Sequence, residues 1–582
     1  TRTILENNSM NKLFSCLIFP CLLSLGSCAT APQNQVVDTD PVKTEPVEAA
    51  PELSTKPFAI DSLYDLLVAD IALNRSQFEL ALEKYLAQAR QTRDLGVIQL
   101  AARVADYVRD NSASLEIALL WIDVAPEDPE AHRAALQAYA IQGEAIKALF
   151  HASWLYRKEA DLDAFLAITS IQMTDAQTSA LITAYQSLNL SAEQQPFVML
   201  ASAILYRTIA ELEIAEQTVT EFLQLQPDNQ SGLLLLAQLL HQQDRIDEAA
   251  ALIGDALQRQ PEDRKLRLQY ARLLTITDLQ QAIIEFEALR LEDPADQEIN
   301  FLLALLLHNQ GQSDRAMGLF AQSSQRPSLS ADSQFHMGSI TESRGDITNA
   351  IKHYSQVRFG RNYLPAVSRL TVLLNQQYGL SAARQNLQRL RSEQPEQAVT
   401  LFQIESNLLV SLQKPELAVS ILTNGLNSFP NDSQLLYARS MVAERQDNFA
   451  LAEQDLRTLI AQDENNASAL NALGYSMVVH TDRQDEAYSL IKRAYLLNPG
   501  DPAIIDSMGW VLFKLGELAQ ALEYLQKALD LLPDPEIAAH LGEVQWVMGN
   551  PEAALKTWQL GLQQAPDHPI IVEAMDRLGA TE

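Results

Sequence analysis

Cysteine is almost missing from this chain. All three cysteines, Cys16, Cys21 and Cys28, fall within the first 28 of 582 residues, and the rest of the sequence has none. A disulfide needs paired cysteines, and thiolate metal sites and cysteine nucleophiles need at least one. The main body of the protein can therefore contain no disulfide, no thiolate metal site and no cysteine nucleophile.

Positive charge is also scarce. The chain has 43 Lys and Arg against 74 Asp and Glu, which gives a formal net charge of −31. Binding to nucleic acid requires basic side chains gathered on one face, so this balance argues against a nucleic-acid partner. Two interpretations of the acidity stay open. It can keep a long surface soluble, or it can favour partners that carry basic patches.

The usual signs of catalysis are absent from the sequence. The nine histidines form no HExxH motif and no close cluster with Asp, Glu or Cys, so we expect scattered histidines on helix surfaces or in a groove and no metal site. No glycine-rich loop follows a strand, and no candidate nucleophile can be paired with a general base from the sequence. We therefore expect no enzyme activity, no cofactor and no small-molecule substrate.

The first part of the chain has the form of a secretory signal. From Met10 it reads MNKLFSCLIFPCLLSLGSCAT, with one lysine, an apolar run from Leu13 to Leu25 and then small residues. The apolar run is shorter than the roughly 20 residues that a membrane-spanning helix needs. We predict that residues 1–27 comprise an upstream extension, TRTILENNS, followed by a lipoprotein signal peptide that starts at Met10.

The end of this segment resembles the lipobox of bacterial lipoproteins. Leu25, Gly26 and Ser27 precede Cys28, the residue that the family lipidates and makes the first residue of the mature protein. Ala29 stands where the family's inner-membrane retention signal has Asp. The resemblance implies a lipid anchor in the outer membrane, and several acyl chains would hold it stably. The alternative is an ordinary signal peptide with an incidental cysteine.

The next segment has the composition of a tether. Residues 29–57 contain five prolines, five acidic residues and no aromatic residue. Such a sequence buries too little apolar surface to offset the entropy cost of ordering. We predict that residues 28–57 are a lipidated cysteine followed by a disordered tether.

A regular repeat fills most of the remaining chain. Equivalent alanines recur at intervals of 33 to 35 residues: Ala215, Ala249, Ala282, Ala316, Ala350, Ala383, Ala418, Ala452, Ala487, Ala521 and Ala554. Each unit reads as two amphipathic helices with short turns. Small residues such as Gly474, Gly509 and Gly542 permit close helix contact. Glycines such as Gly516 and Gly549 end the first helix, and prolines such as Pro533 follow the second.

This pattern resembles the tetratricopeptide repeat. The resemblance implies an all-α fold, a superhelical α-solenoid of helix-turn-helix pairs, with eleven repeats over residues 196–567 and a capping helix at 568–582. Residues 58–195 match the pattern weakly and are predicted to be degenerate helical repeats. Within them, residues 155–195 match poorly and are either a degenerate repeat or a functional insert.

In the repeat family one face of the first helices lines a binding groove. The matching positions here give a candidate strip near the C-terminal end: Tyr475, Asp506, Trp510, Phe513 and Trp546. Trp and Tyr are common among residues that dominate interface energy. The alternative is that these rings pack between helices and meet no ligand. Asp506 and Trp510 stand where a carboxylate-binding clamp would need Lys or Asn, which argues against such a clamp in this unit.

The lipobox, tether and repeats together resemble the outer-membrane tetratricopeptide lipoproteins of Gram-negative bacteria. The run NALGYSMVVHTDRQDEAYSLIKRAYLLNPGDPAIIDSMGWVLFKLG looks like a subgroup that includes an adaptor for a periplasmic carboxyl-terminal processing protease. That likeness implies a non-enzymatic, lipid-anchored adaptor that presents envelope substrates, such as peptidoglycan hydrolases, to a protease. The alternative is a structural component of an outer-membrane assembly or exopolysaccharide export complex.

Overall fold

The computed structural model describes residues 58–159, 163–188 and 195–580. Over these residues the fold is all-α, with 31 α-helices, one short 3-10 turn and no strand, which confirms the predicted fold class. The predicted signal peptide, the lipobox with Cys28 and the tether lie outside the described residues. None of the described helices has the length and apolarity needed to cross a membrane.

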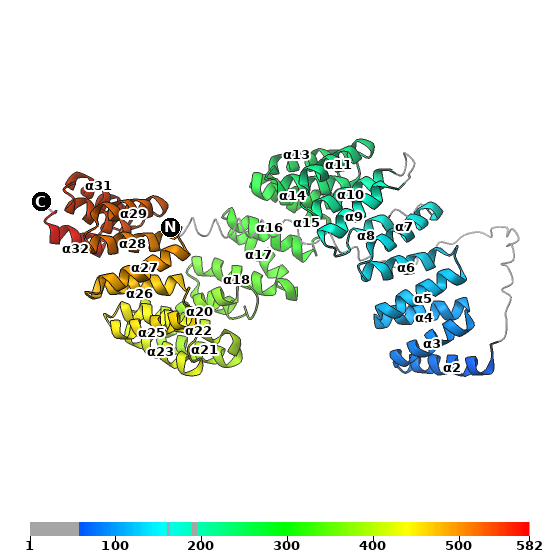
Figure 1. Cartoon of the computed structure of the whole chain (residues 1–582), viewed down its shortest axis with the longest axis horizontal. Coiled ribbons are helices and arrows are strands. Elements are labelled where there is room, and N and C mark those ends of the chain that lie inside the picture. The colour runs from blue at the N-terminus through cyan, green and yellow to red at the C-terminus, as the bar shows by residue number, and fades with distance from the viewer. Residues whose placement is uncertain (1–57, 160–162, 189–194, 581–582) are drawn as a thin grey trace. The chain divides into compact units, whose positions relative to one another are not determined.

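The chain forms two compact units, one ending at Ala316 and the other beginning at Met317. Figure 1 traces the helices of each unit in chain order. In the first unit, the helices are α2 (Ile60–Asn74), α3 (Phe78–Thr92), α4 (Leu95–Val108), α5 (Asn111–Val124), α6 (Pro129–Ile141), α7 (Ala145–Glu159), α8 (Asp163–Ile168), α9 (Asp175–Gln186), α10 (Gln195–Thr208), α11 (Leu212–Leu225), α12 (Gln230–Gln242), α13 (Ile246–Arg259), α14 (Arg264–Thr277), α15 (Leu279–Glu292) and α16 (Gln297–Asn309).

Helix α17 (Ser313–Ser323) spans the boundary between the units. In the second unit follow α18 (Pro327–Ser343), α19 (Ile347–Tyr354), α20 (Tyr363–Tyr378), α21 (Leu380–Glu393), the 3-10 turn η1 (Pro395–Gln397), α22 (Ala398–Ser411), α23 (Pro415–Ser428), α24 (Ser433–Glu444), α25 (Phe449–Gln462), α26 (Ala467–His480), α27 (Gln484–Leu497), α28 (Pro502–Lys514), α29 (Leu518–Leu531), α30 (Pro535–Val547), α31 (Pro551–Gln564) and α32 (Pro569–Leu578).

From α10 to α31 the helices alternate as A and B helices, the first and second of each pair. The turn before five of the A helices, α12, α14, α16, α24 and α28, follows one rule, in which a proline follows the B helix and an Asp or Asn two residues later caps the next helix. After Pro261, for example, the Asp263 carboxylate accepts hydrogen bonds from the backbone N–H groups of Lys265 and Leu266. Such caps satisfy donors that a helix N-terminus leaves free.

Small residues set the distance between the A and B helices, as predicted. A methyl group added at Gly509 of α28 would lie 2.6 Å from Leu525 Cγ in α29, and one at Gly542 of α30 would lie 2.3 Å from Trp558 Nε1 in α31. The predicted helix-ending glycines are also confirmed, because Gly516 and Gly549 have φ of +85° and +83°. Only glycine adopts such angles without strain.

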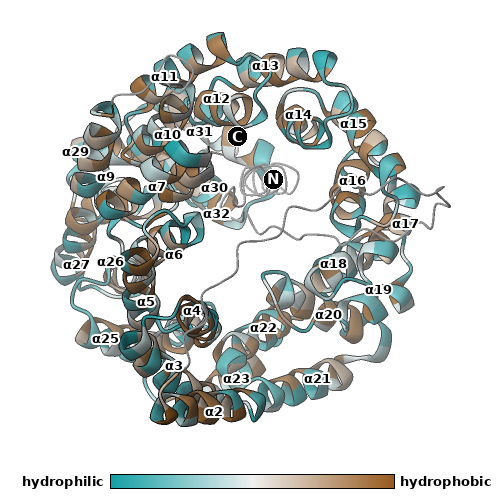
Figure 2. Cartoon of the chain, turned by 90° about the vertical axis from the view of Figure 1, so that its right-hand side faces the viewer, coloured by the Kyte–Doolittle hydropathy of each residue, from teal (hydrophilic) through white to brown (hydrophobic). Residues whose placement is uncertain are grey.

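Side-chain burial follows the repeat. In α16 and α28, nine consecutive residues are buried, Ile299–Leu307 and Ile504–Leu512, because neighbouring helices surround each A helix. The B helices bury only one stripe and keep a polar face. Figure 2 shows the result as brown apolar and teal polar segments that alternate along the helices. Residues 163–168 form α8, which has only 6 residues and is shorter than the A helices elsewhere.

Candidate functional site

Three A helices of the second unit carry the candidate strip. Tyr475 lies on α26, Asp506, Trp510 and Phe513 lie on α28, and Trp546 lies on α30. Helix α28 contacts both α26 and α30. The repeat therefore places these positions on one continuous row of A helices within the unit.

A hydrogen bond across this row shows its curvature. The Tyr475 hydroxyl on α26 donates to Glu536 Oε1 on α30 at 2.7 Å, although α28 stands between these helices in the chain. Two side chains from alternate A helices can meet only if the helices converge on this face. The A-helix face is thus the inner side of the curve. Burial, followed by the nearby charge of Glu536, raises the pKa of Tyr475, so its hydroxyl keeps its proton.

A buried ion pair lies beneath Tyr475. His540 Nδ1 lies 3.0 Å and 3.1 Å from the two carboxylate oxygens of Asp506, and the two residues are 3% and 6% exposed. Burial by itself lowers the pKa of His540, but the charge of Asp506 and its hydrogen bond outweigh burial, with Glu536 and Glu543 adding to them. The net result is a raised pKa, so these carboxylates stabilise the imidazolium form of His540.

Trp510 covers this pair. Its ring stacks on His540 with centroids 4.1 Å apart and planes 20° from parallel, and only 7% of the residue is exposed. Lys514 Nζ lies 4.4 Å from the Trp510 ring centroid, and the half-buried Phe513 ring lies 5.2 Å from it. Side-chain packing within the fold therefore accounts for Trp510 and Asp506. Tyr475 and Phe513 keep part of their surface open, and Lys514 is exposed.

Trp546 belongs to a different cluster. It is half-buried and packs near Trp558, with ring centroids 5.8 Å apart, in a core formed by α30, α31 and α32. The fold thus brings Tyr475, Asp506 and Trp510 together around His540, with Phe513 against Trp510, whereas the ring that contacts Trp546 is Trp558. Glu543 lies between these clusters on α30 and accepts a hydrogen bond from Arg577 of α32 at 2.7 Å.

These groups are joined to one another in a closed hydrogen-bonded network. His540 is held by Asp506, its Nε2 lies 3.5 Å from the Tyr475 hydroxyl, and Tyr475 already donates to Glu536. No serine, threonine or cysteine stands against the imidazole as a nucleophile among these contacts. Within the described part of the chain, no three His, Cys, Asp or Glu residues are grouped to hold a metal ion. The network can rigidify a surface and present its outer side chains.

Comparison with known proteins identifies the repeats. Sequence models of the tetratricopeptide repeat match residues 200–264, 272–329 and 503–535. TPR repeat-containing protein PA4667 of Pseudomonas aeruginosa is 36% identical over 552 residues, which cover 92% of this chain and 91% of that protein. The chain belongs to the tetratricopeptide repeat family.

Solved tetratricopeptide repeat (TPR) and related structures are similar in part. Yeast Tom70 is 12% identical over 89% of this chain and 95% of its own, with a TM-score of 0.32. A structure of Naa15/Naa10 bound to HypK-THB is 11% identical over 89% of this chain and 96% of its own, with a TM-score of 0.38. TPR proteins are generally non-catalytic scaffolds for protein partners, and no enzyme family is evident here.

His540 of this TPR protein does not follow from the sequence pattern. The prediction that the nine histidines are scattered on helix surfaces or in a groove is wrong for His540, at 3% exposure, and for His132 and His151, at 3% and 6%. One signal was available. Asp506 and His540 are 34 residues apart, which is one repeat, so the two A helices place them side by side.

Proposed function

We propose that this TPR protein is a non-enzymatic, lipid-anchored periplasmic adaptor that holds protein partners on its A-helix face. The observation that carries the proposal is the network around His540, which fixes Phe513, Lys514 and Tyr475 at the inner side of the curve. A rigid, partly exposed aromatic group beside a cation is the kind of anchor that dominates protein interfaces.

The anchor in this proposal is Cys28. The lipobox Leu25, Gly26 and Ser27 supports lipidation, and Ala29 supports transfer to the outer membrane. The tether would then allow the repeats to stand away from the lipid surface. Replacing Cys28 with Ala should release the protein from membrane fractions or leave it unprocessed. Unchanged fractionation of this variant with the outer membrane would contradict a lipid anchor at Cys28.

The partners in this proposal are a carboxyl-terminal processing protease and envelope substrates such as peptidoglycan hydrolases. The support is the likeness of the sequence around Gly474 and Gly509 to a subgroup with such an adaptor. An adaptor needs no catalysis, because holding two proteins on one scaffold raises their effective concentration.

A capture experiment tests the adaptor. Residues 29–582 serve as bait in periplasmic and detergent-solubilised envelope extracts, and mass spectrometry identifies the retained proteins. A double variant, Phe513→Ala with Lys514→Ala, should reduce retention about tenfold because it removes the exposed anchor. The matched control, Phe359→Ala with Lys352→Ala, removes an exposed ring and an exposed lysine elsewhere in the same unit and should retain the partners.

Each result has a clear meaning. A protease and cell-wall hydrolases retained by the wild type and the control, and lost from the Phe513 and Lys514 variant, support the adaptor and its A-helix site. A porin and polysaccharide-export proteins in their place would favour the export scaffold. Equal retention by both double variants would exclude the A-helix face as the binding site. Trp510→Ala is unsuitable here, because Trp510 is buried and its loss would leave a cavity.

A further inference from the structure

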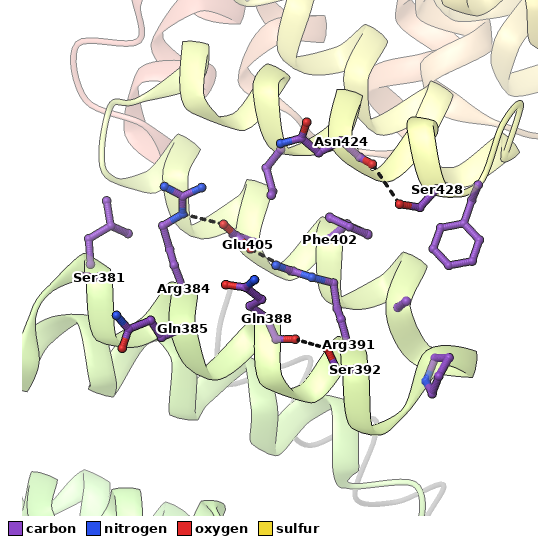
Figure 3. Close-up of a pocket in the computed structure, with 15 residues that line it drawn as sticks. Ser381, Arg384, Gln385, Gln388, Arg391, Ser392, Phe402, Glu405, Asn424 and Ser428 are labelled. Atoms are coloured by element: carbon purple, nitrogen blue, oxygen red, sulfur yellow. Dashed lines mark hydrogen bonds and ion pairs between the residues drawn. The ribbon is translucent and has the colours of Figure 1, made fainter.

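A second candidate site lies in the same unit, away from the A-helix network. A cavity of about 840 Å³ opens between the B helices α21 and α23, with α22 as its floor (Figure 3). The 3-10 turn η1 lies between α21 and α22 and contributes Pro395 to the lining. Clefts of 300 to 1,000 Å³ are of the size that holds a ligand of a few residues.

The floor of this cavity holds one carboxylate between two guanidinium groups. Arg384 Nε donates to Glu405 Oε1 at 2.7 Å, and Arg391 NH1 donates to Glu405 Oε2 at 2.8 Å. Glu405 is 1% exposed, whereas the side chains of Arg391 and Arg384 are 13% and 40% exposed. Figure 3 shows both arginines reaching Glu405 from α21.

The charges in the cavity do not cancel. Arg384, Arg391 and Glu405 are the charged residues of its lining, so two cations face one anion in a chain of net charge −31. A buried pair elsewhere in the unit differs. Arg439 donates two hydrogen bonds to Asp455, at 2.8 Å and 2.7 Å, and the charges balance. At Glu405 each arginine makes one bond, so the guanidinium edges keep N–H groups for a further acceptor.

The two arginines have different roles. Arg391 is fixed, because its guanidinium carbon also lies 4.3 Å from the centre of the Phe402 ring. Arg384 is more open to solvent and is bound to Glu405 through Nε, so the terminal nitrogens are the groups that it can offer. An incoming carboxylate at Arg384 would balance the extra positive charge.

The remaining lining matches a peptide better than a simple anion. Phe402 and Ile421 are buried apolar residues of the lining and suit an apolar neighbouring side chain. The rim carries side-chain amides and hydroxyls, which both donate and accept hydrogen bonds, as the N–H and C=O groups of a peptide backbone require. These exposed rim residues are Ser381, Gln385, Gln388, Ser392, Asn424 and Ser428.

We propose that this cavity binds an acidic side chain of a partner's peptide segment, with its carboxylate against Arg384 and an apolar neighbour against Phe402 and Ile421. The site goes beyond the proposed function, because it lies between B helices and shares no residue with the A-helix network. A scaffold with two such surfaces can hold two partners at once.

Two libraries of capped heptapeptides test the site directly. One library has Glu fixed at its centre, the other has Gln, and all other positions are varied. The immobilised full-length protein should retain the Glu library at least tenfold more than the Gln library. Arg384→Gln should abolish this preference. Arg389→Gln should keep it, because Arg389 lies on the same helix, pairs with Glu393 and is outside the cavity lining.

A second variant keeps the test independent of Arg384. Gln388→Trp places a large ring at the exposed mouth of the cavity and should block retention without disturbing the ion pair. Equal retention of both libraries, or a Glu preference that survives both variants, would overturn the proposal. So would competition by 10 mM acetate or phosphate that removes all retention, since it would indicate a site for small anions. Loss of partners in the Phe513 and Lys514 variant concerns the other site and leaves this result unaffected.

Discussion

Two buried histidine clusters of this protein, one in each unit, have opposite electrostatics. In the first unit, His132 Nδ1 lies 3.0 Å from His151 Nδ1, between α6 and α7, and the His132 ring stacks on Trp154 with centroids 3.7 Å apart. In the second unit, His540 pairs with Asp506 and stacks on Trp510. Both units thus hold a buried His and Trp stack.

The difference lies in the second neighbour of each histidine. Burial lowers the pKa of both His132 and His151, and the proximity of His132 helps to bring that of His151 to about 4. At neutral pH these two rings are uncharged. His132 Nε2–H donates to the Pro126 carbonyl, so His132 Nδ1 accepts a hydrogen bond from His151 Nδ1–H. Burial acts in the same direction on His540, but carboxylates reverse its effect. The charge of the neighbours, and not the degree of burial, decides the sign of the shift.

The largest expected effect comes from breaking the His540 pair. Asp506→Asn leaves a buried imidazole without its counterion, so the pKa of His540 should fall, and the second unit should lose about 3 kcal/mol of unfolding free energy. Hydrogen exchange of peptides from α28 and α30 measures the loss. Asp530→Asn, an exposed change on α29, should have little effect. A stable Asp506→Asn protein with an unchanged His540 pKa would contradict the ion pair.

The two units should respond to pH in opposite directions. The pKa of His151 in the folded protein is below its ordinary 6.5. Its contribution to the free energy of unfolding is therefore present above pH 6.5 and is lost as the pH falls from 6.5 towards 4. The slope is at most about 1.4 kcal/mol per pH unit. His540 has a raised folded pKa, so its contribution is present below 6.5 and is lost as the pH rises through the folded value.

Hydrogen exchange between pH 5 and 8, corrected for intrinsic exchange rates, measures both trends in one sample. Peptides from α6 and α7 should open more readily at the acidic end, and peptides from α28 and α30 at the basic end. A shared direction in the two units would refute the contrast.

A smaller effect should come from the stacked tryptophans. A cation over an indole ring contributes about 0.5 to 1 kcal/mol, which corresponds to roughly 0.4 to 0.7 of a pKa unit. Phe keeps an aromatic face, so Trp510→Phe should lower the pKa of His540 by only part of that amount, whereas Trp154→Phe should shift the pKa of the neutral His132 less. Titration by nitrogen-15 NMR of labelled histidines gives both values. Equal shifts would mean that His540 is not charged.

The smallest effect is expected at Glu127. This exposed carboxylate pairs with Lys158 and acts on His132 from outside the cluster. Glu127→Gln should lower the pKa of His132 slightly further and leave the stability of the first unit unchanged, since solvent screens such a charge. The same NMR titration reports it. A rise in the pKa of His132 would show that a closer group controls it.

The repeat explains why most of the fold was predictable. Alanines such as Ala521, helix-contact glycines such as Gly509 and turn glycines such as Gly516 are dictated by local geometry, and each occurs at a fixed position in its unit. A buried helix contact or a left-handed turn permits few residue types, so these positions can be recognised from the sequence alone. The positions of Gly509 and Gly516 matched their predicted roles.

The candidate site was predictable only in part. The family pattern led to Tyr475, Asp506, Trp510 and Phe513 as neighbours, and the structure places them around one network. The family pattern could not reveal that Trp510 is only 7% exposed, because the same spacing suits a ring in a groove and a ring between helices. His540 was overlooked because a lone histidine has no local motif, and its partner is one repeat away.

The sequence by itself determined the helical period, the close contacts at glycine and alanine and the excess of negative charge, since these depend on neighbours within one or two turns of chain. The tertiary structure decided which charges meet. The curvature of the row of A helices brings Tyr475 to Glu536, and burial removes water from Asp506 and His540. In the cavity beside α22, two arginines pair with the single carboxylate of Glu405. Electrostatic energy depends on distance and on solvent exclusion, and three-dimensional packing sets both.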